Sequence, residues 1–80
     1  MERDLRELID YMVQSLVEHP EEVRIAEKQG DRSTIYQLSV HRDDRGRVIG
    51  KNGQTIKAIR SIVMAAATLK GVNATVDVTD

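Results

Sequence analysis

The chain has 80 residues, of which 40% are hydrophobic and 31% charged, and it contains no cysteine. This length and composition predict one globular domain over residues 1–80 and exclude a disordered chain. The lack of cysteine excludes a disulfide framework, a thiolate zinc site and a thiol nucleophile. No apolar run is long enough to span a membrane and the start does not resemble a signal peptide, so we expect a cytoplasmic protein without membrane association.

The net charge of −1 is distributed unevenly along the chain. Nine acidic and four basic residues give residues 1–31 a net charge of −5, whereas seven basic and two acidic residues give residues 32–60 a net charge of +5. A mildly acidic protein with one basic segment is suited to a modest, local contact with a nucleic-acid backbone. A solvated charged surface is the alternative, and we favour it for Arg32 and Arg42. The basic residues nearest the centre of this segment are Arg42, Arg45, Arg47, Lys51, Lys57 and Arg60.

The first predicted element is an amphipathic helix over residues 3–18. Its apolar residues recur at helical spacing, which predicts that one face packs against a core. The helix should end before Pro20, because the residue preceding a proline disfavours helical geometry. The apolar stripe consists of Leu5, Leu8, Ile9, Met12, Val13, Leu16 and Val17.

A hairpin is predicted next, with strands over residues 22–28 and 34–41. Apolar and polar residues alternate along both segments, and the turn residues 30–33 separate them. This pattern is typical of two antiparallel strands joined by a tight turn.

Two helices and a strand complete the chain. A short helix is predicted to end at Gly50, and Asp43 or Asp44 could cap it. A long helix over residues 54–70 and a strand over residues 74–79 follow. The apolar residues of the long helix cover more than half of its circumference, more than one sheet can bury, so its excess face could serve self-association.

This order of elements predicts an α+β fold. The order is helix, strand, strand, helix, helix, strand, and two helices lie between the second and third strands. Those strands should therefore be parallel and joined by a right-handed crossover. We expect a three-stranded mixed sheet with the helices packed on one face.

The segment Val48–Ile56, with the sequence Val-Ile-Gly-Lys-Asn-Gly-Gln-Thr-Ile, carries the clearest functional signal. Two glycines bracket Lys51 and Asn52, and glycine permits positive φ and close approach of backbones. A predicted helix begins directly after Gly53, and helix N-termini favour phosphate. The pattern predicts a clamp for a nucleic-acid backbone, whereas a G-x-x-G without this context is usually a plain turn. The spacing excludes a Walker A loop.

This segment, with Arg47 before it, resembles the signature of the KH (K-homology) RNA-binding domain, whose G-x-x-G loop clamps about four nucleotides. The element order resembles the type II, prokaryotic form of that domain, with order α-β-β-α-α-β. The whole chain is similar to small stand-alone bacterial KH proteins of the KhpA type. The residues expected to contact RNA are Arg47, Val48, Ile49, Gly50, Lys51, Asn52, Gly53, Gln54, Thr55, Ile56 and Lys57.

An apolar groove beside the loop is expected to receive the bases. Core packing is an equally weighted alternative for the three aliphatic residues nearest the glycines. The chain has only two aromatic residues, Tyr11 and Tyr36, and neither lies beside the loop. Because base stacking on aromatic rings is a large part of single-strand affinity, we expect weak binding with little sequence preference. The expected lining is Val48, Ile49, Ile56 and Ile59, with Thr75 and Val76 on the far side.

The predicted function is therefore weak binding of single-stranded RNA, in post-transcriptional regulation or RNA chaperoning. The resemblance implies a homodimer and a possible heterodimer with a larger KH protein of the KhpB or Jag type. The alternative is a protein-interaction or scaffold module with little RNA binding. We predict no enzyme, catalytic residue, metal site or cofactor, since His19 and His41 are the only histidines and lie far apart in the sequence.

Overall fold

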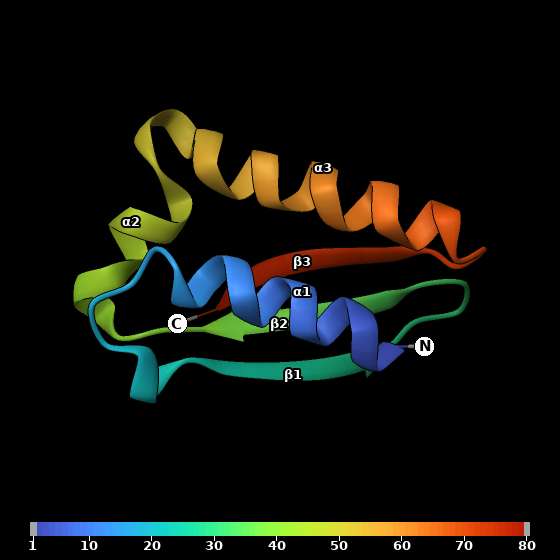
Figure 1. Cartoon of the computed structure of the whole chain (residues 1–80), viewed down its shortest axis with the longest axis horizontal. Coiled ribbons are helices and arrows are strands. Elements are labelled where there is room, and N and C mark those ends of the chain that lie inside the picture. Colours follow the sequence, from blue (N-terminus) through green and yellow to red (C-terminus); the bar gives the residue numbers. More distant parts are fainter. Residues whose placement is uncertain (1, 80) are drawn as a thin grey trace.

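The computed structural model describes residues 2–79 and places three helices on one face of a three-stranded sheet (Figure 1). The expected α+β fold and element order are confirmed. Single 3₁₀ turns lie at Pro20–Glu22, Arg42–Asp44 and Lys51–Gly53. The main elements are α1 (Glu2–Gln14), β1 (Arg24–Gln29), β2 (Thr34–Ser39), α2 (Arg45–Ile49), α3 (Gln54–Leu69) and β3 (Ala74–Thr79).

The sheet has the order β1-β2-β3, with β2 in the centre. β1 runs antiparallel to β2, with Arg24 opposite Ser39, and β3 runs parallel to β2, with Ala74 opposite Thr34. The hairpin and the parallel pair are thus as predicted. The side chains of Tyr36 and Leu38 on β2 are completely buried, because α1 and α3 cover that face of the sheet.

The core is formed by apolar side chains of the helices, mainly α1 and α3, and of the covered face of the sheet. Each helix supplies a stripe at helical spacing, which explains why the two helices pack side by side over the strands. Full burial of such a side chain stabilises the fold by about 1.5–3 kcal/mol. The core members on α1 and α3 are Leu5, Ile9, Val13, Ile56, Ile59, Val63 and Ala67, and Val48 is the core member on α2.

The predicted C-terminal end of the first helix is wrong. α1 ends at Gln14, whereas the sequence pattern extended the helix to residue 18. The hydroxyl of Ser15 donates to the Tyr11 carbonyl in the last turn, and the amides of Glu18 and His19 instead donate to the carboxylate of Asp44. That carboxylate replaces the helical acceptors and draws the chain away from the helix axis.

The hairpin strands also differ from their predicted bounds. β1 begins two residues later than expected, because Pro20–Glu22 forms a 3₁₀ turn, and it extends to Gln29. β2 ends at Ser39, although the next residue, Val40, is still buried. β3 has the predicted bounds.

α3 ends at Leu69, one residue earlier than predicted. Gly71 follows with a φ of 75°, and the Val72 amide donates to the Ala67 carbonyl. This pairing is a Schellman motif, which glycine favours because it adopts positive φ without strain. Within residues 2–79, no helix is both long and apolar enough to cross a membrane.

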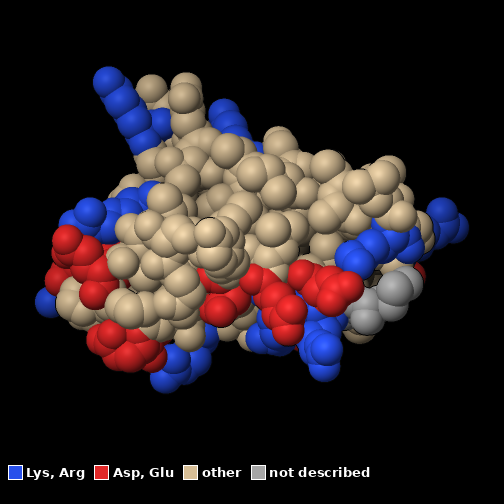
Figure 2. Space-filling model, viewed as in Figure 1, with Lys and Arg blue, Asp and Glu red and all other residues tan. Residues whose placement is uncertain are grey.

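One face of α3 remains exposed, as its wide apolar surface suggested. On this face Leu69 is 90% exposed and Ile62 48%, and the alanines at 58 and 65 are exposed beside them. Met64 is 54% exposed but lies on another side of the helix, at the hollow that Thr75 of β3 also lines. The surface over α3 is largely free of charge in Figure 2. α1 therefore covers only part of the apolar surface of α3.

Candidate nucleic-acid interface

The glycine-containing loop, residues 50–53, joins α2 to α3 at the end of the molecule opposite the hairpin turn (Figure 1). Gly50 has φ 78° and ψ 170°, Asn52 has φ 57° and Gly53 has φ 72°. Asn52 is the only residue other than glycine with positive φ in residues 2–79, and asparagine tolerates that region better than most side chains. The loop therefore needs its two glycines and tolerates the asparagine between them.

Gly50 is required for a second reason, because its backbone lies against the first turn of α3. A Cβ added at Gly50 would overlap Thr55 Oγ1, and it would lie 2.6 Å from Thr55 Cβ and 2.8 Å from the Thr55 amide nitrogen. A Cβ added at Gly53 would meet nothing within 4 Å. Gly50 thus sets how closely α2 approaches α3, whereas Gly53 supplies only a left-handed backbone conformation.

The amides of the loop fall into two groups. The Gly53 amide donates to the Gly50 carbonyl at 3.0 Å, and the Gln54 amide donates to the Lys51 carbonyl, so both are used within the turn. The amides of Lys51 and Asn52 donate no hydrogen bond to any acceptor within residues 2–79. Both residues are exposed, so these two amides and the Lys51 ammonium group can reach an anion from solvent.

The eleven residues predicted to contact RNA form one continuous stretch around the loop but differ in exposure. Val48 and Ile56 are buried at 0% and 6% exposure and belong to the core. Gly50, Gly53 and Thr55 are half-buried. The exposed members of the stretch are Arg47, Ile49, Lys51, Asn52, Gln54 and Lys57.

The expected apolar groove lining is only partly at the surface. Ile59 and Val76 are buried with Val48 and Ile56, which leaves Ile49, at 38% exposure, as the exposed aliphatic side chain beside the glycines. Thr75 lines a hollow of about 180 Å³ with Met64 and Thr68. Most aliphatic residues of the predicted groove are therefore core residues, as the alternative interpretation held.

Arg60 spans the gap between α3 and β3 next to the predicted groove. Its Nε atom donates to the Val76 carbonyl at 2.7 Å, and its guanidinium group lies 3.6 Å from Asp77 Oδ1. This arginine belongs to the basic segment, but it connects two elements of the fold. Its charge is partly neutralised by Asp77.

Asp44 holds the base of α2. It occupies the N-cap position of α2, but its buried carboxylate accepts from the amides of Glu18 and His19 at 3.0 and 2.9 Å and does not cap the helix. Burial alone would raise the pKa of Asp44, but those two hydrogen bonds, together with His19 and Arg47, outweigh it and hold the pKa below its ordinary value. The carboxylate thus stays charged inside the protein.

Arg47 is partly engaged by the same contacts. It lies 3.4 Å from Asp44 Oδ1 and 3.1 Å from Glu18 Oε1, while its side chain remains 49% exposed. Of the basic residues closest to the loop, Lys51 and Lys57 form no ion pair within the described residues. Basic side chains stand out from the surface at this end of the molecule in Figure 2.

The sequence did not predict that the two histidines are neighbours. The rings of His19 and His41 stack with centroids 4.1 Å apart and an interplanar angle of 22°. Continuing the β1–β2 register two residues past Arg24 and Ser39 sets Glu22 opposite His41. The register of the predicted hairpin therefore indicated that Glu22 and His41 lie close together. No local sequence pattern indicated that His19 lies beside them.

Comparisons with known proteins agree with this architecture. A family model described as "KhpA/KhpB, KH domain" matches residues 6–78. A protein named RNA-binding protein KhpA from Chlamydia pneumoniae is 43% identical over 74 residues, which cover 92% of this chain and 95% of that protein. A protein of the same name from Bacillus subtilis is 45% identical over 65 residues, covering 81% of this chain and 80% of the relative.

Solved structures show the same fold within a larger protein. A crystal structure of Era from Aquifex aeolicus superposes with a TM-score of 0.61 at 21% identity. A structure of Era in complex with MgGDPNP and a segment of 16S ribosomal RNA gives a TM-score of 0.62 at 22% identity. The match covers 92% of this chain but only 29% and 28% of those structures, so the chain spans less than a third of their length.

Proposed function

Because the chain belongs to the KhpA/KhpB family of KH domains, we propose that it binds single-stranded RNA through the loop at residues 50–53. Its relatives are named as RNA-binding proteins and not as enzymes, in agreement with the function class that the sequence predicted. One observation carries the choice of site. Among the described residues, the amides of Lys51 and Asn52 have no hydrogen-bond partner and the Lys51 side chain has no ion-pair partner, directly before the N-terminus of α3.

In this proposal the sugar-phosphate backbone crosses the loop. Phosphate oxygens accept from the amides of Lys51 and Asn52, and the partial positive charge at the start of α3 adds to the attraction. The Lys51 ammonium group supplies a full charge, with Lys57 one turn further along the exposed side of α3. Such contacts position the chain of nucleotides but do not select their sequence.

The bases would lie beside Ile49. Val48 and Ile56 are buried, so their role in this proposal is to hold the two helices on either side of the loop. Without an aromatic platform, a site with two or three phosphate contacts should bind weakly and with little sequence preference. In a salt titration, the slope of log K against log[salt] should be shallow, about −1.5 to −2 for two or three contacts to single-stranded RNA.

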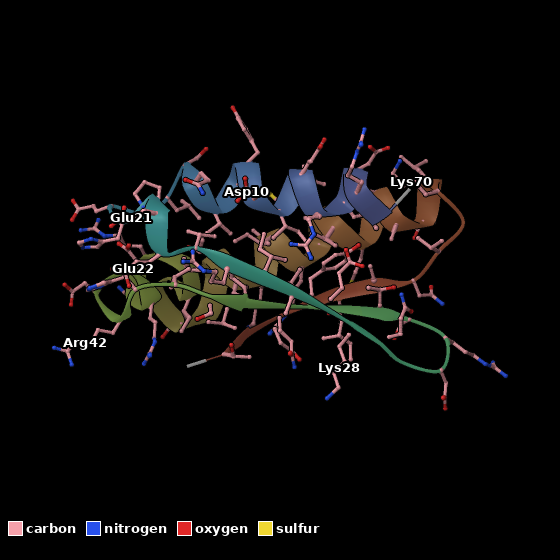
Figure 3. All side chains as sticks on the ribbon, turned by 90° about the horizontal axis from the view of Figure 1, so that it is seen from below. Asp10, Glu21, Glu22, Lys28, Arg42 and Lys70 are labelled. Atoms are coloured by element: carbon pink, nitrogen blue, oxygen red, sulfur yellow. The ribbon has the colours of Figure 1, made fainter. Side chains whose placement is uncertain are left out.

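Replacing Lys51 and Asn52 with aspartate tests the site. Two new carboxylates would face any phosphate, so binding to a short unstructured RNA should be lost, whereas stability should change little because both residues are exposed. The matched control replaces Lys28 and Gln29 with glutamate. These exposed residues of β1 undergo the same change of charge, and Lys28 points away from the helices (Figure 3).

Chemical-shift mapping with this RNA measures both affinity and location. If the aspartate variant folds and binds as the natural chain does, the loop is not the site. If both double variants lose binding equally, the contact depends on net charge and not on the loop. A steep salt slope would show that the basic surface makes more phosphate contacts than proposed.

We further propose that the exposed face of α3 pairs two copies of the chain. Ile62 and Leu69 expose apolar surface on one side of this helix, and linked copies would raise the effective concentration of a weak RNA site. Replacing Ile62 with glutamate should produce a monomer by sedimentation at tens of micromolar, whereas Leu16→Glu, at an exposed apolar residue outside α3, should not. A monomeric natural chain at that concentration would refute the homodimer.

The alternative function is a scaffold module that binds another protein and little RNA. The family model spans both KhpA and KhpB, so a larger KH protein of the KhpB or Jag type is the partner that we propose to test. RNA binding by the isolated chain would favour the first function, and its absence with retained binding to that partner would favour the second. The first function implies a cytoplasmic protein in post-transcriptional regulation or RNA chaperoning.

A further inference from the structure

A cluster of two histidines and one glutamate lies at the end of the sheet that leads into α2. His19 follows α1, Glu22 ends the 3₁₀ turn before β1, and His41 follows β2. One ligand atom from each of the three residues lies within 4.8 Å of the other two. Figure 3 shows Glu22 at the same end of the molecule as Arg42, the first residue of the link to α2.

The fold holds the three side chains together through backbone contacts. The Asp44 carboxylate accepts from the His19 amide at 2.9 Å, and the Asp44 amide donates to the His41 carbonyl at 2.8 Å. One buried residue therefore connects the two segments that carry the histidines. The Glu22 amide donates to the His19 carbonyl at 3.0 Å, and side chains three residues apart in a 3₁₀ turn lie on the same side.

The local charge favours a cation. Carboxylate oxygens of Glu21, Glu22 and Asp43 lie 3.6–3.8 Å from ring nitrogens of the two histidines. Both histidines are only partly buried, so a hydrated ion can reach them. The negative charge of the three carboxylates around the stacked imidazoles can be neutralised either by protons or by a metal ion.

We propose that His19, Glu22 and His41 bind a divalent transition metal ion, with Zn²⁺ as the ion that this ligand set suits best. Two imidazoles and one carboxylate are a common set for Zn²⁺, with water in the fourth position. Imidazole ligands disfavour Mg²⁺ and Ca²⁺, which prefer oxygen. The ion would join the segment after α1 to the segment before α2 and so stabilise the base of the loop-bearing helix.

Binding requires a small rearrangement, which supplies a direct readout. The ligands of a tetrahedral zinc ion are closer together than 4.8 Å, and the ring nitrogens of stacked imidazoles do not converge on one point. The two rings must therefore leave their present stacked arrangement, in which the interplanar angle is 22°. His41 Nδ1 now accepts from the Asp43 amide at 3.0 Å, so coordination through Nε2 would place a proton on Nδ1, where Asp43 Oδ2 lies 3.6 Å away.

The experiment titrates ZnCl₂ into the chelator-treated full chain and follows heat, melting temperature and the ring signals of the histidines by NMR. The chain has only two histidines and no cysteine, so the signals are simple to assign. We expect one ion per chain, shifts of both rings, and a Tm raised by roughly 10–20 °C when free zinc is about 100 times Kd. MgCl₂ at the same concentration should change none of these.

Two variants and a control identify the ligands. Glu22→Gln keeps the size of an exposed side chain, and His41→Asn keeps an acceptor for the Asp43 amide, so both should fold. Each should weaken zinc binding at least tenfold. Glu21→Gln removes the neighbouring carboxylate outside the trio and should bind within threefold of the natural chain.

The proposal is overturned if zinc up to about 1 mM leaves the Tm and both histidine rings unchanged (a Kd in that range corresponds to only weak association). It is also overturned if Glu22→Gln binds zinc like Glu21→Gln, or if only one ring shifts. None of these results depends on RNA binding.

Discussion

Replacing Gly50 with alanine should be among the most damaging single changes in the chain. Gly50 has φ 78° and ψ 170°, a region that only glycine occupies readily and that costs other residues about 1–3 kcal/mol. The new Cβ would also overlap Thr55 Oγ1 and lie 2.8 Å from the Thr55 amide nitrogen, so the start of α3 would have to shift. Overpacking of this kind costs about 1–3 kcal/mol more, which gives an expected loss of about 2–6 kcal/mol.

Gly53→Ala is the matched control. Its φ of 72° and ψ of 16° lie in the left-handed helical region, where alanine costs about 1–2 kcal/mol, and an added Cβ meets nothing within 4 Å. Alanine also restricts the unfolded chain more than glycine does, which offsets about 0.4–1 kcal/mol of the lost stability. The net loss for Gly53→Ala should therefore be about 1 kcal/mol.

Urea unfolding at 25 °C, followed by circular dichroism, measures both free energies. Because a domain of this size has a total stability of only about 4–12 kcal/mol, Gly50→Ala should lose about half of it and unfold at a much lower urea concentration than Gly53→Ala. Adding Thr55→Ala should not rescue the variant, since the Thr55 Cβ and amide nitrogen remain in the way. Equal stability of the two alanine variants, or full rescue, would refute the argument from close approach.

Three further predictions concern the core, the buried acid and the edge of the sheet. Leu38→Ala should cost about 2–5 kcal/mol of unfolding free energy because the side chain is fully buried, whereas Leu69→Ala should cost less than about 0.5 kcal/mol. The pKa of Asp44 is lowered in the folded protein, so its charged carboxylate stabilises the fold above the ordinary carboxyl pKa. This stabilisation is lost as the pH falls through the folded pKa. Asp44→Asn should therefore reduce the difference in stability between pH 6 and pH 3. A larger difference would contradict that sign. Arg60→Met should speed amide hydrogen exchange in β3 by about fivefold, since it removes the hydrogen bond to Val76, worth about 1 kcal/mol.

Local sequence patterns correctly predicted the ends of those elements that are set by residues close in the sequence. β3 has its predicted bounds because Ala74, Val76 and Val78 alternate cleanly with polar residues. The short helix before the loop ends at Gly50 as expected, because the conformation of that glycine breaks the helix. Neither feature needs a distant contact.

Features set by distant contacts could not be predicted in this way. α1 stops at Gln14 because Asp44 captures two amides that would otherwise continue the helix, and that acid lies 26 residues beyond Glu18. The same acid brings His19 to His41. Whether Val48 and Ile56 face the core or a groove also depended on how α2 and α3 pack over the sheet.

The arginine contacts at the two outer strands have a consequence for aggregation. Arg6 of α1 donates to the Ile25 carbonyl on β1, as Arg60 of α3 does to the Val76 carbonyl on β3, both at 2.7 Å. An intruding chain that extended the sheet at either side would have to displace a guanidinium group from the carbonyl it needs. Edge-to-edge stacking into fibrils is thereby discouraged on both sides of the sheet.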